Sequence, residues 1–182
     1  MKKKVKIIIG AVCSLLGLVI LIPVIYFFVL TDTIELTKIP APDIQEQLDI
    51  YVEAGLCRRA KMNEDETAAI IHLTRYQRQK WIKRVDEDLE YMLGQANRLQ
   101  NMTFEISNDA KELTLSANEN MNFSSAGTYV LILTYDMELF QVLNGEADWK
   151  IDFILKDMDT GEILYTEDYP EKNIRVEEEM WN

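Results

Sequence analysis

The longest apolar segment of the chain covers residues 5–30, which contain no acidic residue and a single basic one, Lys6. At 1.5 Å per residue, a helix of this length extends about 39 Å, whereas the hydrocarbon core of a bilayer is about 30 Å thick. A cleavable secretory signal is the alternative, but its apolar core covers only about 7–15 residues and ends at a small-residue cleavage site. We therefore predict a retained transmembrane anchor helix over residues 5–30.

The charges on either side of this segment indicate its orientation. Residues 1–4 contain three lysines, whereas the first charged residues after the segment are Asp32 and Glu35. Because Lys and Arg remain on the cytoplasmic side, we predict a basic cytoplasmic N-terminus and an extracytoplasmic C-terminal domain. The expected localisation is the cell membrane, crossed once, and the short lysine-rich start is typical of a bacterial cell-envelope protein.

Three small residues share one face of the predicted anchor. Gly10, Ser14 and Gly17 are spaced by four and three residues, so a helix places them in one row where a second helix can approach closely. This face would support a homo-oligomer. Small residues scattered through a single span are the simpler interpretation, and the sequence leaves both open.

The first part of the remaining chain is predicted to be an extended spacer followed by two helices. Residues 31–43 contain two prolines and short polar steps, which favour an extended spacer. Residues 44–54 have apolar positions at helical spacing and end before Gly55, which predicts a short helix. Asn63 is a candidate N-cap, and the apolar stripe that follows it predicts a long helix over residues 64–100.

The apolar period then changes from helical spacing to two. This alternation predicts hairpins over residues 102–116 and 149–169. Residues 126–143 fit both a helical stripe and a partial strand alternation, and their length favours a helix. Residues 171–182 are predicted to be an acidic tail. The expected fold class is α+β: one exported domain over residues 44–170, with helices packed on an antiparallel β-sheet in the order ααββαββ.

The charge of the chain limits its possible partners, and its cysteine content limits how the domain can be stabilised. All 31 acidic residues follow the apolar segment, but only 15 of the 19 basic residues do, so this part of the chain has a net charge of −16. Nucleic acid is excluded as an expected partner, because phosphate binding needs a basic field. Cys57 is the only cysteine after the segment, so no disulfide can form within the domain and packing must stabilise it.

One basic cluster stands out on the predicted long helix. Lys83–Glu87 and Arg84–Asp88 can pair at i,i+4, so an ordinary solvated helix face explains most of the cluster. The alternative is a docking patch for an acidic partner or for lipid headgroups. The residues of this patch are Arg75, Arg78, Lys80, Trp81, Lys83 and Arg84.

Other residues suggest chemistry only weakly. Residues 157–162 alternate oxygen-bearing side chains with a glycine, as a calcium-binding loop does, but Asp, Thr and Gly are also what a tight hairpin turn selects. We predict the turn. His72, the single histidine, has no partners spaced for a zinc site and is expected to be a helix residue. The sequence thus predicts no catalytic residue, no metal site and no cofactor.

Together these patterns predict a membrane-anchored extracytoplasmic protein that is non-catalytic and serves as a binding or accessory module of an envelope assembly. Its expected partners are the lipid bilayer and a membrane or envelope protein that the sequence does not specify. The alternative is a cell-envelope enzyme, of the wall or lipid hydrolase type, that uses carboxylates. A deep cleft holding two close, buried acids would favour the enzyme.

Overall fold

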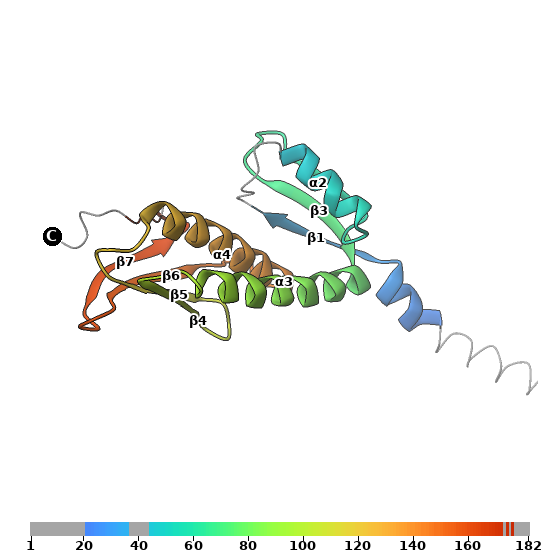
Figure 1. Ribbon diagram of the computed structural model, residues 1–182. Coiled ribbons are helices and arrows are strands. Elements are labelled where there is room, and N and C mark those ends of the chain that lie inside the picture. Colours follow the sequence, from blue (N-terminus) through green and yellow to red (C-terminus); the bar gives the residue numbers. More distant parts are fainter. Residues whose placement is uncertain (1–20, 37–43, 173, 175, 177–182) are drawn as a thin grey trace, which may run out of the picture.

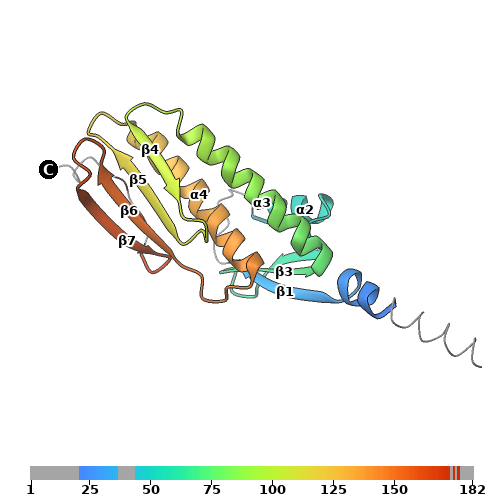
Figure 2. The ribbon, with the colours of Figure 1, turned by 90° about the horizontal axis from the view of Figure 1, so that it is seen from below.

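The computed structural model describes residues 21–36, 44–172, 174 and 176 of the chain. Within them the fold is α+β, with four helices, a three-stranded antiparallel sheet and a four-stranded mixed sheet. Two long helices lie side by side over one face of the larger sheet, and the smaller sheet lies at one end of these helices (Figures 1 and 2).

The smaller sheet is built from β1(Thr31–Leu36), β2(Arg59–Met62) and β3(Ala69–Thr74), in the order β1-β3-β2, and α2(Ile44–Glu53) lies beside it. Helix α2 agrees with the helix predicted over residues 44–54. The predicted spacer over residues 31–43 is wrong for its first part, because residues 31–36 are paired with β3. The rest of the spacer lies outside the described residues.

The predicted helix over residues 64–100 is corrected at both ends. Helix α3(Arg75–Ala96) begins at Arg75, where the side chain of Thr74 accepts a hydrogen bond from the N–H of Gln77 and the Gln77 side chain accepts one from the N–H of Thr74. Asn63 instead shapes the turn between β2 and β3, because its side-chain oxygen accepts the N–H groups of two following residues. Asn63, which was predicted to cap a helix, is therefore a turn residue.

The larger sheet follows α3 and has the strand order β4-β5-β6-β7. Both predicted hairpins are present, and residues 126–143, which fit both a helix and a strand in the sequence, are helical as predicted. The elements are β4(Met102–Ile106), β5(Glu112–Ala117), α4(Phe123–Asn144), β6(Ile151–Asp157) and β7(Ile163–Tyr169). The prediction of a purely antiparallel sheet is wrong, because β5 and β6 are parallel. Helix α4 carries the chain back along the sheet between these strands, as a parallel pair requires.

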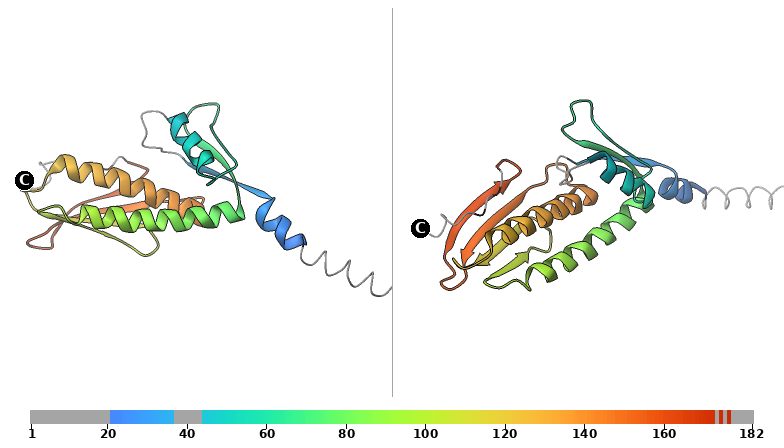
Figure 3. Two further views of the ribbon diagram at one scale, coloured as in Figure 1. Left: turned by 45° about the vertical axis from the view of Figure 1, so that its right-hand side comes forward. Right: turned by 45° about the horizontal axis from the view of Figure 1, so that its top comes forward.

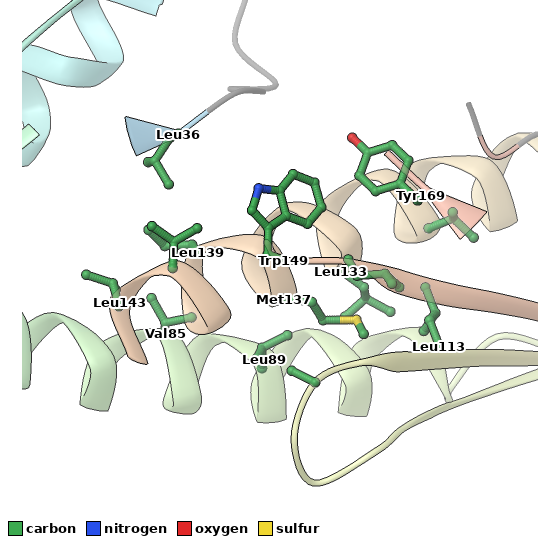
Figure 4. Packing of buried hydrophobic residues seen from close by; sticks show 14 of the residues in the cluster. Leu36, Val85, Leu89, Leu113, Leu133, Met137, Leu139, Leu143, Trp149 and Tyr169 are labelled. Atoms are coloured by element: carbon green, nitrogen blue, oxygen red, sulfur yellow. The ribbon is translucent and has the colours of Figure 1, made fainter. Parts of the chain in front are cut away.

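Helix α4 is the centre of the core. Val85 and Leu89 of α3 point toward α4 from one side, and Met137 extends from α4 among them (Figure 4). Leu36, the last residue of β1, points toward Leu139 of α4. The two sheets therefore share one hydrophobic core around α4, which makes the domain a single packed unit.

One buried amide connects α4 to the loops that precede β5 and β6, the two central strands of the larger sheet. Gln141 is only 1% exposed. Its Nε2 donates to the carbonyl oxygens of Ala110 at 2.7 Å and Lys150 at 2.9 Å, and its Oε1 accepts from the N–H of Lys150 at 3.3 Å. Gln141 thus satisfies three backbone groups at the ends of two separate loops.

Candidate functional site

The apolar segment joins the domain at the start of α3. Residues 21–28 are helical and extend away from the body of the protein at this end (Figure 3). The Phe28 ring lies 5.1 Å from the Tyr76 ring, and the Arg58 guanidinium donates to the carbonyl oxygen of Phe28 at 2.8 Å. We call this region the junction, and its residues are Tyr26, Phe27, Phe28, Arg58, Arg75 and Tyr76. The junction links the segment to α3 and to the loop just before β2.

Large apolar side chains are exposed along the segment side of the junction. Each is at least 39% exposed, whereas the apolar residues of the domain are mostly buried. These residues are Leu21, Ile22, Val24, Ile25, Tyr26, Phe28, Val29 and Leu30. Apolar surface of this extent calls for a covering layer that the described residues do not supply.

Arg75 is a second arginine that contacts the segment. Its guanidinium carbon lies 3.9 Å from the centre of the Tyr26 ring, in a cation–π arrangement. Arg75 is the first residue of α3, and its side chain is exposed. No ion pair of Arg75 is found in the described part of the chain.

Arg78 has a different role from Arg75. Its Nε donates to the carbonyl oxygen of Leu143 at 2.5 Å, its Nη2 donates to that of Val142 at 3.3 Å, and its Nη1 lies 3.4 Å from the Asp32 carboxylate. The last carbonyl groups of a helix have no partner within the helix. Arg78 therefore caps the end of α4 and ties it to β1, which is a stabilising role.

We expect the Arg78→Ala change to lower the free energy of unfolding by about 1–2 kcal/mol, because the α4 carbonyls lose charge-assisted hydrogen bonds. Urea unfolding of the full chain in detergent micelles, followed by tryptophan fluorescence, measures the change. Lys83→Ala, on the exposed part of the same helix, is the control and should stay within about 0.5 kcal/mol of the wild type. Equal effects of the two changes would contradict the capping role.

A cavity of about 360 Å³ opens between the segment, the start of α3 and the end of α4. We call it the junction cavity. Its polar lining includes Asp32, Arg75, Arg78, Gln79 and Asn144, and its apolar lining includes Tyr26 and Phe27. A second cavity, of about 420 Å³, lies on the other side of Arg78 between β1 and the loop after α4. The junction cavity is the one that meets the segment.

The structure separates the residues of the predicted docking patch. Trp81 is only 2% exposed and packs against Tyr51, with ring centres 4.9 Å apart and ring planes tilted by 57°, so it belongs to the core. Lys80 donates to the carbonyl oxygen of Ala54 at 3.2 Å. Lys83 and Arg84 pair with the acids four residues further on, at 3.4 and 3.7 Å. Arg75 alone of the six belongs to the junction and lacks an ion pair within the described residues.

The predicted membrane helix and its small-residue face fall largely outside the described residues. Gly10, Ser14 and Gly17 all lie there, so their face stays a prediction. Within residues 21–36 and 44–172, no helix combines the length and apolar content that a bilayer crossing requires.

Sequence reasoning missed a second polar site, between α2, α3 and α4. A cavity of about 190 Å³ there is lined by Tyr51, Arg84, Asp88, Tyr135 and Asp136, among others. The hydroxyls of Tyr51 and Tyr135 are hydrogen-bonded to each other. Burial, and then the nearby Asp88 carboxylate, raise the pKa of Asp136 to about 7. The available signal was an aspartate within the apolar stripe of the predicted helix over residues 126–143.

The remaining candidates are explained by the fold. Cys57 is buried, and burial raises its pKa to about 11. His72 lies in β3, not in a helix as predicted, with its Nδ1 3.0 Å from the Thr33 hydroxyl. Asp157 accepts the N–H groups of Asp159 and Thr160 in the turn before β7, as the predicted hairpin requires. Among the described residues, no group of three or more His, Cys, Asp or Glu side chains could hold a metal ion.

Comparison with protein-family models, with curated proteins and with solved structures finds no match to this chain. Its function is therefore argued from its own residues.

Proposed function

We propose that this chain is a single-pass membrane-anchored protein, with a cytoplasmic N-terminus and an extracytoplasmic C-terminal domain. The domain acts as a non-catalytic binding or accessory module of a cell-envelope assembly. Its partners are the bilayer and a membrane or envelope protein close to the bilayer surface.

The observation that carries this proposal is the direct connection between the apolar segment and the domain. Strand β1 begins at Thr31, and the segment is fixed to the domain by the Arg58 hydrogen bond and the stacking of Tyr76 on Phe28. A domain joined in this way stays at the surface of the membrane that holds its segment. Tyrosine is enriched at such interfaces, which agrees with the junction's two tyrosines, Tyr26 and Tyr76.

An envelope enzyme is the second candidate, and the cavity beside Asp136 favours it. This cavity has two acids in its lining, one of which has a raised pKa. However, the Asp88 side chain is 56% exposed and pairs with Arg84. At about 190 Å³, the cavity is also smaller than the roughly 300–1,000 Å³ typical of small-molecule sites. The binding module therefore remains the better-supported function.

We expect thiol labelling in spheroplasts to reveal the topology. The Lys3→Cys and Glu119→Cys changes, each made in a chain with Cys13 and Cys57 replaced by alanine, place one thiol before the segment and one in an exposed loop. A membrane-impermeant maleimide should label the Glu119→Cys chain in intact spheroplasts. It should label the Lys3→Cys chain only after lysis.

Two results would contradict the proposed function. One is recovery of the chain in the soluble fraction after spheroplast lysis. The other is the reverse labelling pattern, which would place the domain in the cytoplasm. Cross-linking in intact cells then identifies the protein partner, and capture of the chain with itself alone would favour a homo-oligomer over an accessory module.

A further inference from the structure

The junction cavity has the size, charge and position of a binding site that the proposed function does not explain. It encloses about 360 Å³ and lies where the apolar segment, α3 and the end of α4 meet. Tyr26 and Phe27 form its segment side, and Arg75 and Gln79 extend from the first turns of α3. A ligand in this cavity contacts an apolar helix on one side and polar donors on the other.

The charges of the cavity favour an anion. The C-terminal end of a helix is partially negative and would repel an anion, but Arg78 covers the end of α4 with its guanidinium. Asp32 is the one acidic residue of the described lining, and it pairs with the same Arg78 at 3.4 Å. Arg75 then remains as the cation that can pair with a bound group.

The neighbouring surface indicates what carries the anion. The cavity adjoins residues 21–30, whose large apolar side chains are exposed. A phosphate in the cavity would therefore have its attached chains beside an apolar helix, an arrangement that fits a phospholipid. Arg58 lies at the same junction, but it is not part of the cavity lining and its guanidinium donates to the Phe28 carbonyl, so Arg75 is the cation that faces the bound group.

We propose that the junction cavity binds the phosphate of an anionic phospholipid headgroup, with Arg75 as the pairing cation. This inference rests on the proposed function, because a membrane-anchored chain brings the cavity to the headgroup region. Arg suits this role, since its planar guanidinium can donate two parallel hydrogen bonds to one phosphate. The domain's net charge of −16 opposes any general attraction to anionic lipid, so the preference depends on the local charge of Arg75.

The test measures which lipid the full chain retains. The chain is purified in detergent, mixed with equal amounts of phosphatidylglycerol and phosphatidylcholine, and analysed by native mass spectrometry. The phosphate of phosphatidylcholine is balanced by its own choline cation, so this lipid has no net charge for Arg75 to neutralise. We expect wild type to retain phosphatidylglycerol about fivefold over phosphatidylcholine, and the Arg75→Gln chain to show a ratio near one, since each basic residue at a membrane surface contributes about fivefold. Lys83→Gln, on the same helix but paired with Glu87, is the control and should keep the wild-type ratio.

Three outcomes would overturn the proposal. The first is an equal ratio for the two lipids in wild type. The second is a ratio unchanged by Arg75→Gln, once circular dichroism shows that the variant is folded. The third is loss of the preference when inorganic phosphate is added at constant ionic strength, which would assign the cavity to a soluble phosphate. Thiol labelling separates the two proposals: the lipid site fails alone if the topology is as expected but the lipid ratio is equal.

Discussion

Replacing Gln141 with leucine should lower the free energy of unfolding by about 3–5 kcal/mol, because one buried and two part-buried backbone groups lose their hydrogen-bond partner. Gln141 joins Ala110, in the loop between β4 and β5, to Lys150 at the start of β6. Leucine has a similar volume, so packing is largely kept. The cost therefore comes from the unpaired backbone groups, above all the carbonyl oxygen of Ala110, whose bond to Gln141 is buried.

Urea unfolding of the full chain in detergent micelles, followed by tryptophan fluorescence, measures this loss. Gln100→Leu is the matched control, because Gln100 is exposed at the turn after α3, and its effect should stay within about 0.5 kcal/mol. A Gln141→Leu effect as small as that of the control would mean that the loops at Ala110 and Lys150 find other partners.

The elements predicted correctly are those whose signal is local. Helix α4 and the two hairpins of the larger sheet have regular apolar spacing and turn residues such as Asn108 and Gly161 at their ends. Helix α2 has the same local signal. The direction of strand pairing is not local, because it depends on where α4 returns the chain. The parallel alignment of β5 and β6 was therefore missed.

The region between α2 and α3 was mispredicted because its residues fit two periods. Ile70 and Leu73 continue the stripe of α3 backwards by helical spacing, yet Ile71 and Leu73 alternate as a strand does, and both are fully buried. Pairing with β1 and β2 on either side favours the strand. The sequence did not predict this pairing, because residues 31–36, with their short polar steps, resembled a spacer.

The docking patch was only partly predictable, because residues close in sequence lie on different faces of a helix. Arg78 stands four residues before Ile82 and seven before Val85, so it shares the side of α3 that packs on α4. Arg75 and Tyr76 instead meet the apolar segment. The junction itself joins residues 30 to 49 positions apart in sequence, and no local pattern indicates such a contact.

Replacing Asp136 with asparagine should stabilise the protein strongly at pH 8 and very little at pH 4. Burial, and then Asp88, raise the pKa of Asp136 from 3.8 to about 7 in the folded protein. A carboxyl group with a raised pKa favours folding below its unfolded pKa, and this contribution is lost as the pH rises toward the folded pKa. Asp136 therefore destabilises the wild type increasingly between pH 4 and pH 7, and above pH 7 the penalty is constant.

The size of the effect follows from the pKa shift. A shift of this size corresponds to about 4 kcal/mol at most, and solvent screening at a half-buried side chain reduces it to about 2 kcal/mol. Urea unfolding of the wild type and the Asp136→Asn chain at pH 4, 6 and 8 gives the difference between their free energies of unfolding at each pH. The contributions of the other acids are common to both chains and cancel in this difference. Asp86→Asn, on the exposed face of α3, is the control and should give the same small difference at each pH.

The neighbouring groups make this prediction specific. Tyr51 of α2, Arg84 and Asp88 of α3, and Tyr135 of α4 line the cavity with Asp136. The Asp88→Asn change removes a repelling charge, so it should lower the pKa of Asp136 in the folded protein. The destabilisation by Asp136 should then level off at a lower pH and be smaller. In the double variant, the pH-dependent gain from Asp136→Asn should therefore be reduced. A gain that is equal at pH 4 and pH 8 would show that folding does not raise the pKa of Asp136, which would contradict this prediction.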